Sequence, residues 1–308
     1  MSGVAAATIA GVIFGLFQVV NRAALVEMDV LASTFIQLLV SSAFMVVALL
    51  VQGTEGISSL SASAAANFTL AGLIHFLGGW TLLNTSQKRL GAAKTSPLLA
   101  TTPLFGTFLA AVTLDEIPGA VPLAGVALIV VGVYVTQLES IRAARVPATV
   151  GGERIVDGSP REAPMWASLF GLGAALSWAV SPIFIRRGLE ELGDPILGVT
   201  IGVLAATVAF GVVVVAGRHG ASLVSSSRNV LAWKVVAGLL VGLATWSRWY
   251  ALGLVSVAAV LGLGLLTVPT VMVLAPVVSG KHLERITVPV VVGSAFVVAG
   301  ALVLIVRG

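Results

Sequence analysis

The sequence contains no cysteine, so disulfide bridges and thiolate metal sites are excluded, and cysteine usage says nothing about the redox compartment. Charge is scarce as well, since Asp, Glu, Lys and Arg make up 10% of the residues, whereas soluble domains carry roughly 25%. The histidines His75, His219 and His282 lie in different segments, and no H-E-x-x-H motif is present. These absences argue against a metal site, and we expect no cofactor.

Long apolar segments dominate the chain, in which 58% of the residues are hydrophobic. A soluble protein of this composition would lack the polar residues needed to cover its surface. A membrane-spanning helix needs roughly 20 mostly apolar residues, and none of the segments alternates as a barrel strand does. The sequence therefore predicts an all-α membrane protein with ten transmembrane helices, near residues 4–22, 31–51, 67–87, 95–113, 119–138, 165–185, 195–216, 232–252, 256–278 and 287–306.

Most basic residues lie between the apolar segments, and the formal net charge is +4. This placement suits anionic lipid headgroups better than nucleic acid. We therefore expect a multi-pass protein of the cell membrane whose partners are membrane lipids and a small-molecule substrate, with no nucleic acid. The first residues, MSGVAAATIAG, lack a basic n-region and indicate the start of the first helix rather than a cleaved signal peptide.

The longest polar stretch, residues 139–164, divides the apolar segments into two sets of five. It is rich in Arg and Glu and contains several prolines and a Gly-Gly pair, a composition typical of a solvated linker. We therefore expect a first repeat over residues 1–138, the linker, and a second repeat over residues 165–308.

The two halves carry matching residues in the same order. The matched pairs, at spacings of 165 to 168 residues, are Asp29 and Asp194, Trp80 and Trp246, Pro103 and Pro269, Gly125 and Gly293, and Gly132 and Gly300. Each repeat has an odd number of spans, so the second repeat enters the membrane upside down. The sequence thus predicts two inverted five-helix repeats, the arrangement found in many secondary transporters.

Two series of residues point to a known family. The first consists of Gly91-Ala92-Ala93, Pro103, Glu116, Gly125 and Gly132, and the second of Ala251-Leu252-Gly253, Ala258-Ala259, Pro269, Glu284, Gly293 and Gly300. Both resemble the fourth and fifth helices of an EamA-type repeat of the drug/metabolite transporter superfamily. The resemblance extends over nearly the whole chain apart from 139–164. It implies a ten-helix basket around a central cavity that exports or imports metabolites, amino acids or amphipathic compounds.

The orientation in the membrane departs from what the resemblance implies. Thirteen Lys and Arg residues lie in the loops after the first, third, fifth, seventh and ninth segments, and at most four lie on the opposite side. The positive-inside rule then places both termini outside. Members of the superfamily usually keep both termini in the cytoplasm, and both orientations are compatible with ten helices.

The matched prolines Pro103 and Pro269 lie inside the fourth and ninth segments. A proline within a helix removes one backbone hydrogen bond and kinks the helix. Matched interruptions in two halves point to a central binding site, although a kink also occurs for packing alone.

Aromatic residues supply further candidates for substrate binding. Trp80 and Asn84 share a face of the third segment, and Trp246 and Tyr250 occupy the matching face of the eighth. A pair of indoles related by pseudo-symmetry is expected to wall a pocket for an amphipathic or cationic solute. The alternative is an interfacial aromatic belt.

Two ionisable side chains complete the predicted site. Arg248 lies about a turn inside the end of the eighth segment, where it either meets substrate or snorkels to headgroups. His75 lies well within the third segment, and either relays protons or bonds a neighbouring helix as a neutral histidine. Gln18, Asn21 and Gln37 are additional polar candidates whose facing the sequence leaves open.

These features favour a secondary transporter that works by alternating access, in efflux or uptake, and not an enzyme. A membrane-embedded enzyme and a non-transporting receptor or scaffold are the alternatives. The acidic residues fall in loops or at segment ends, which predicts that no intramembrane carboxylate couples transport to protons.

Overall fold

The computed structural model describes residues 1–25, 27–113, 119–136, 138, 165–216, 227–255, 257–278 and 286–307. Within these ranges the regular elements are helices and no strand occurs, which confirms the predicted all-α class. The predicted linker, residues 139–164, lies outside the described residues, as do Glu116, Glu284, His219 and His282.

The helices follow the predicted apolar segments closely. In the first half they are α1 (Gly3–Leu25), α2 (Val30–Gln52), the 3-10 turn η1 (Glu55–Ser59), α3 (Ala62–Gly72), η2 (Leu73–Trp80), α4 (Thr81–Leu90), α5 (Ala92–Leu99), α6 (Thr102–Thr113) and α7 (Ala120–Thr136). In the second half they are η3 (Met165–Ala167), α9 (Ser168–Leu192), α10 (Pro195–Ala216), α12 (Arg228–Leu252), α13 (Val257–Gly264), α14 (Thr267–Val278) and α15 (Val288–Arg307).

The lengths of these helices suit a bilayer. In the described part of the chain, seven helical stretches are long and apolar enough to cross a membrane, among them the continuous stretch α3–η2–α4, whose middle is π-helical. Two shorter apolar helices, Leu123–Thr136 and Val288–Val303, accompany them. The predicted fourth and ninth spans, 95–113 and 256–278, differ from simple helices because each is divided into two.

Matched acidic residues begin matched helices. The Asp29 carboxylate accepts hydrogen bonds from the backbone N–H groups of Leu31 and Ala32 at the start of α2, at 2.9 and 3.2 Å. Asp194 does the same at the start of α10, where the Leu197 N–H donates at 3.0 Å. Such N-caps satisfy backbone donors that the first turn leaves free, so both acids have a local structural role.

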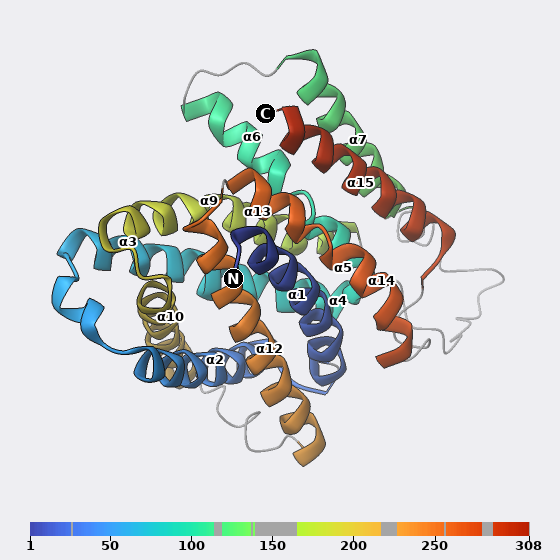
Figure 1. Ribbon diagram of the computed structural model, residues 1–308. Helices are drawn as coiled ribbons and strands as arrows, with labels where there is room; N and C mark the ends of the chain where they lie inside the picture. Colours follow the sequence, from blue (N-terminus) through green and yellow to red (C-terminus); the bar gives the residue numbers. More distant parts are fainter. Residues whose placement is uncertain are drawn as a thin grey trace.

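Helices α7 and α15 lie side by side at one edge of the bundle (Figure 1), where four glycines allow their backbones to touch. A Cβ atom at Gly132 would lie 2.6 Å from the carbonyl oxygen of Gly293, and one at Gly300 would lie 2.6 Å from that of Gly125. Since residue numbers rise along one helix as they fall along the other, the pair is antiparallel. Small residues are the usual means of close helix packing in membranes.

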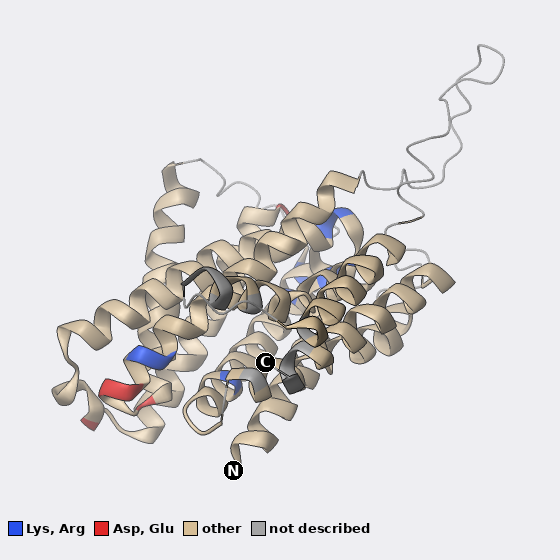
Figure 2. Ribbon diagram, turned by 90° about the horizontal axis from the view of Figure 1, so that it is seen from above, with Lys and Arg blue, Asp and Glu red and all other residues tan. Residues whose placement is uncertain are grey.

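The surface of the bundle is apolar. Large aliphatic side chains stand exposed on several helices, among them Val51 at 83%, Val215 at 79% and Val277 at 78%. Lys, Arg, Asp and Glu occupy only a few places on the described ribbons (Figure 2). Apolar surface on this scale is favourable in contact with lipid, so the structure supports the predicted multi-pass membrane protein.

Candidate functional site

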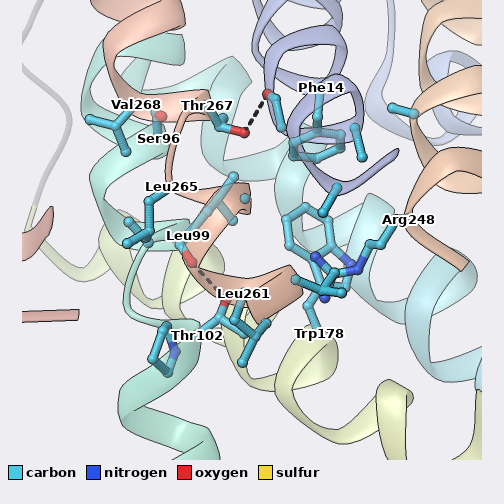
Figure 3. A pocket seen from close by; sticks show the side chains of 18 of the residues that line it. Phe14, Ser96, Leu99, Thr102, Trp178, Arg248, Leu261, Leu265, Thr267 and Val268 are labelled. Carbon is cyan, nitrogen blue, oxygen red and sulfur yellow. Dashed lines mark hydrogen bonds between the residues drawn. The ribbon is translucent and has the colours of Figure 1, made fainter. Parts of the chain in front are cut away.

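A cavity of about 80 Å³ lies near the centre of the bundle, between helices of both halves (Figure 3). Its walls come from α1, η2, the junction of α5 and α6, α9, α12, and the junction of α13 and α14. The lining residues are Ala7, Ala10, Gly11, Phe14, His75, Ser96, Leu99, Ala100, Thr102, Pro103, Trp178, Ala244, Thr245, Arg248, Val260, Leu261, Gly264, Leu265, Thr267 and Val268. Most of them are apolar, and none is an Asp or Glu.

Both interrupted helices break at the cavity wall. The turn between α5 and α6 is at Ala100 and Thr101, and the turn between α13 and α14 is at Leu265 and Leu266. The breaks therefore occur about three residues before Pro103 and Pro269, and the predicted kinks are complete interruptions. Each proline then lies in the first turn of the new helix, where its missing N–H costs little.

The break before Pro103 is stabilised by threonine hydroxyls. Pro103 has no N–H to donate to the carbonyl oxygen of Leu99, and the hydroxyl of Thr102 donates to that oxygen instead, at 2.6 Å. At the other break, the Thr267 hydroxyl donates to the carbonyl oxygen of Gly11 on α1, at 2.9 Å (Figure 3). Pro103 is buried and lines the cavity, whereas Pro269 is exposed and does not.

An aromatic wall closes one side of the cavity. The Trp178 indole of α9 meets the Phe14 ring of α1 edge-on, with centroids 5.2 Å apart, and stacks on the His75 imidazole at 5.6 Å. His75 Nδ1 and the Ser181 hydroxyl are hydrogen-bonded at 2.8 Å, and the indole N–H of Trp178 donates to the His75 carbonyl oxygen at 3.2 Å. His75 thus bonds a neighbouring helix and also faces the cavity.

Arg248 reaches from α12 into the cavity on the side where Trp178 lies (Figure 3). Its Nε and Nη2 atoms are buried and have no hydrogen-bond partner among the described residues. Of the residues predicted from sequence to bind substrate, Arg248 and His75 are the two that line this cavity.

The predicted tryptophan pair lies elsewhere. Trp80 is buried in the apolar core, with its ring edge-on to Phe76 at 5.0 Å, and Trp246 packs against a cluster that includes Leu49 and Ile196. Neither tryptophan lines the cavity. The aromatic side chains that do are Trp178 of α9 and Phe14 of α1. A part for either indole in solute binding stays a prediction.

Tyr250 and Asn84 also lie outside the cavity. The Tyr250 hydroxyl donates to the carbonyl oxygen of Met1 at 3.3 Å, and its side chain lines a separate hollow beside Leu189 and Gly253. Asn84 belongs to a buried polar cluster on α1, α2, α4 and α12. This polar cluster consists of Gln18, Asn21, Thr34, Gln37, Asn84, Gln87 and Lys234, all fully buried.

Asn21 is the centre of the polar cluster. Its amide N–H groups donate to Asn84 Oδ1 at 2.8 Å and to Gln87 Oε1 at 2.7 Å, while its own Oδ1 accepts from the Lys234 ammonium. Lys234 also donates to Gln37 Oε1 at 3.1 Å. Two amide oxygens therefore accept from the lysine, and within the described residues no ion pair joins it to a carboxylate.

Comparison with known proteins identifies the first half of the chain. A family model described as "EamA-like transporter family" matches residues 1–138. Those residues are similar to the EamA-like transporter family, and the predicted resemblance is confirmed for them.

One solved structure, described as "Crystal structure of protein", aligns with 96% of this chain and 95% of its own, with 15% sequence identity and a TM-score of 0.57. At this identity the likeness concerns the fold alone, and it extends beyond the EamA-like residues into the second half. No match was found among curated proteins.

Three residues of the cavity and the polar cluster, Trp178, Phe14 and Lys234, are not among the candidates that the sequence predicts. Lys234 lies near the start of the predicted eighth span, a position typical of a loop-facing lysine, yet the structure buries it completely. The available signal was the set of amides Gln18, Asn21 and Gln37, which need partners wherever the bilayer supplies none. Trp178 has no matching tryptophan in the first half, so the symmetry between the halves gives no reason to select it.

Proposed function

We propose that this EamA-like protein is a secondary transporter of the cell membrane, which moves a small metabolite, amino acid or amphipathic solute by alternating access around the central cavity. The observation that carries the proposal is the pair of helix breaks at matched positions of the two halves, both on the cavity wall. Secondary transporters typically hold their solutes at discontinuous helices near the membrane midplane.

Ten spans in two inverted repeats form part of the proposal, and contacts between matched residues support it. Gly125 matches Gly293 and Gly132 matches Gly300, yet Gly125 meets Gly300 and Gly132 meets Gly293. A crosswise pattern of this kind is what a two-fold axis between the repeats produces. The hydroxyls of Ser42 and Thr207, which are 165 residues apart, are hydrogen-bonded at 2.7 Å where α2 meets α10.

The polar cluster closes one side of the cavity. Along α1 the cavity residues end at Phe14, and Asn21 follows about 10 Å further on. Along α12, which runs the opposite way, Lys234 precedes the first cavity residue, Ala244, by about 15 Å. Asn21 and Lys234 therefore both lie between the cavity and the end of the bundle that carries Arg22 and Lys88. We infer that the hydrogen bonds of the polar cluster part when the cavity opens on that side.

Alternating access predicts that a cavity residue is reached from both sides of the membrane. The natural absence of cysteine means that a single Thr245→Cys substitution supplies the only thiol, on the cavity wall. In proteoliposomes of defined orientation, we expect a membrane-impermeant maleimide to label this thiol whether added outside or trapped inside. Labelling from both sides requires the protein to change between a state open to one side and a state open to the other, because the polar cluster closes the cavity on the side of Arg22 and Lys88.

The matched control is Ser58→Cys, on the exposed turn η1 between α2 and α3. It should react from one side only. If Thr245→Cys also reacts from one side alone at every temperature and reagent concentration, the protein does not alternate, and a receptor or scaffold function is favoured instead.

A further inference from the structure

The central cavity contains a cationic group that no described residue of its lining compensates. Arg248 is the single charged residue of its lining, and no acidic residue lines it. The buried Nε and Nη2 atoms of Arg248 lack hydrogen-bond partners among the described residues. A second unsatisfied group, the Ser96 hydroxyl, belongs to the same wall on α5, and its residue is fully buried.

Unsatisfied donors of this kind are costly in an apolar protein interior. A buried polar group without a partner costs roughly 1–3 kcal/mol, and a charged group costs more. Two exposed arginines of the described chain avoid this cost: the Arg186 side chain is 46% exposed and lies 3.8 Å from Glu190, and Arg89 lies over the Trp166 ring at 4.7 Å. Arg248 has no such arrangement. A negatively charged ligand would supply what the lining lacks.

The other lining residues indicate the size and polarity of the ligand apart from its charged group. Phe14, Trp178, Leu99, Leu261 and Val268 present apolar surface, and the cavity volume of about 80 Å³ leaves room for a compact body only. The Thr102 and Thr267 hydroxyls already donate to backbone oxygens, so Arg248 and Ser96 are the unpartnered donors among these groups. The lining therefore suits one oxyanion joined to a small apolar group.

We propose that the cavity binds a small organic anion, with a carboxylate or another singly charged oxyanion at Arg248 and an apolar group against Phe14 and Trp178. This assignment rests on the proposed transport function and names its substrate class. Moving one such charge across the membrane is worth about 2.3 kcal/mol per 100 mV, so the membrane potential alone would drive the anion toward the positive side.

Binding is tested on the full chain, purified in an uncharged detergent, by the rise in melting temperature that a ligand of the folded state produces. The probes are benzoate and benzenesulfonate, each compared with its neutral amide of the same shape, benzamide and benzenesulfonamide. We expect both anions to stabilise the protein and both amides to have at least tenfold weaker effects. Equal binding of an anion and its amide would overturn the proposal.

The variant test uses Arg248→Gln, with Arg186→Gln as the control for loss of a positive charge away from the cavity. We expect Arg248→Gln to weaken anion binding at least tenfold and Arg186→Gln to leave it unchanged. If Arg248→Gln does not fold, Arg248→Lys takes its place, with a smaller loss expected because an ammonium binds oxyanions less well. Unchanged anion binding in the folded Arg248 variant would refute the assignment.

Two further arms separate the possible outcomes. Stabilisation by phosphatidylglycerol but by none of the free anions would mean that a lipid headgroup occupies the site, and would overturn the substrate assignment. Flux of benzenesulfonate in proteoliposomes, which stays ionised and crosses lipid poorly, tests transport separately. Binding without flux would contradict the transporter and leave the anion site intact, whereas two-sided labelling of Thr245→Cys without anion binding would contradict the anion site alone.

Discussion

Gly72→Ala should prevent stable folding or reduce stability by more than about 3 kcal/mol, because α3 and α10 touch through their backbones. A Cβ atom at Gly72 would lie 2.1 Å from the carbonyl oxygen of Gly202 and 2.4 Å from its Cα atom. These are backbone atoms, which have no rotamer to change. The two helices would have to separate by about 1 Å along a closely packed interface.

The measurement is the melting temperature of the purified variant, together with the fraction that elutes as a single species in detergent. Gly106→Ala in α6 is the matched control, since no atom lies within 4 Å of the added Cβ. Alanine is the better helix former, so this control should be neutral or slightly more stable. Similar behaviour of the two variants would contradict the close packing of α3 against α10.

Asn21→Leu is expected to lower stability by about 3 kcal/mol, since it removes the central residue of the polar cluster. Asn84 Oδ1 and Gln87 Oε1 would lose the donor that Asn21 provides, and Lys234 would keep only Gln37 of its two observed acceptors. In the membrane no water replaces these bonds, so each unsatisfied group retains its cost of desolvation.

Asn67→Leu provides the same chemical change at a partly exposed position of α3, where the Asn67 amide donates to the Ser63 carbonyl oxygen and, among the described residues, has no bond to another helix. Its melting temperature should stay within a few degrees of the wild type. The Asn21 variant should also let a maleimide reach Thr245→Cys faster from the Lys88 side, because the closed side of the cavity is weakened. A stable Asn21→Leu protein with unchanged labelling would refute the view that the polar cluster closes the cavity.

Composition and order along the chain were sufficient for the membrane class, the helical content and the EamA-like first half. A run of apolar residues long enough to cross the bilayer is stable in lipid as an α-helix, and that rule needs no tertiary information. The matched acids Asp29 and Asp194 were visible in the same way, and the structure shows that both begin helices. Neither result depends on which helix lies beside which.

The lining of the cavity required the structure. The indoles Trp80 and Trp246 matched in sequence, yet the structure places Trp178 and Phe14 at the cavity and Trp80 in the core. In a membrane, apolar residues surround the whole circumference of a helix, so hydrophobic periodicity no longer marks which face is buried. Facing is then decided by the packing of neighbouring helices.

The sequence by itself determined that the chain spans a membrane, that two helices depart from regular geometry near Pro103 and Pro269, and that charges are rare within the spans. Only the tertiary structure decided which rare polar groups meet. It brought Lys234 to Asn21 and Gln37, from segments about 200 residues apart, and left Nε and Nη2 of Arg248 without a partner among the described residues. The physical reason is that buried hydrogen bonds form between neighbours in space, and neighbours in space are set by the close approach of helices at sites such as Gly72 and Gly293.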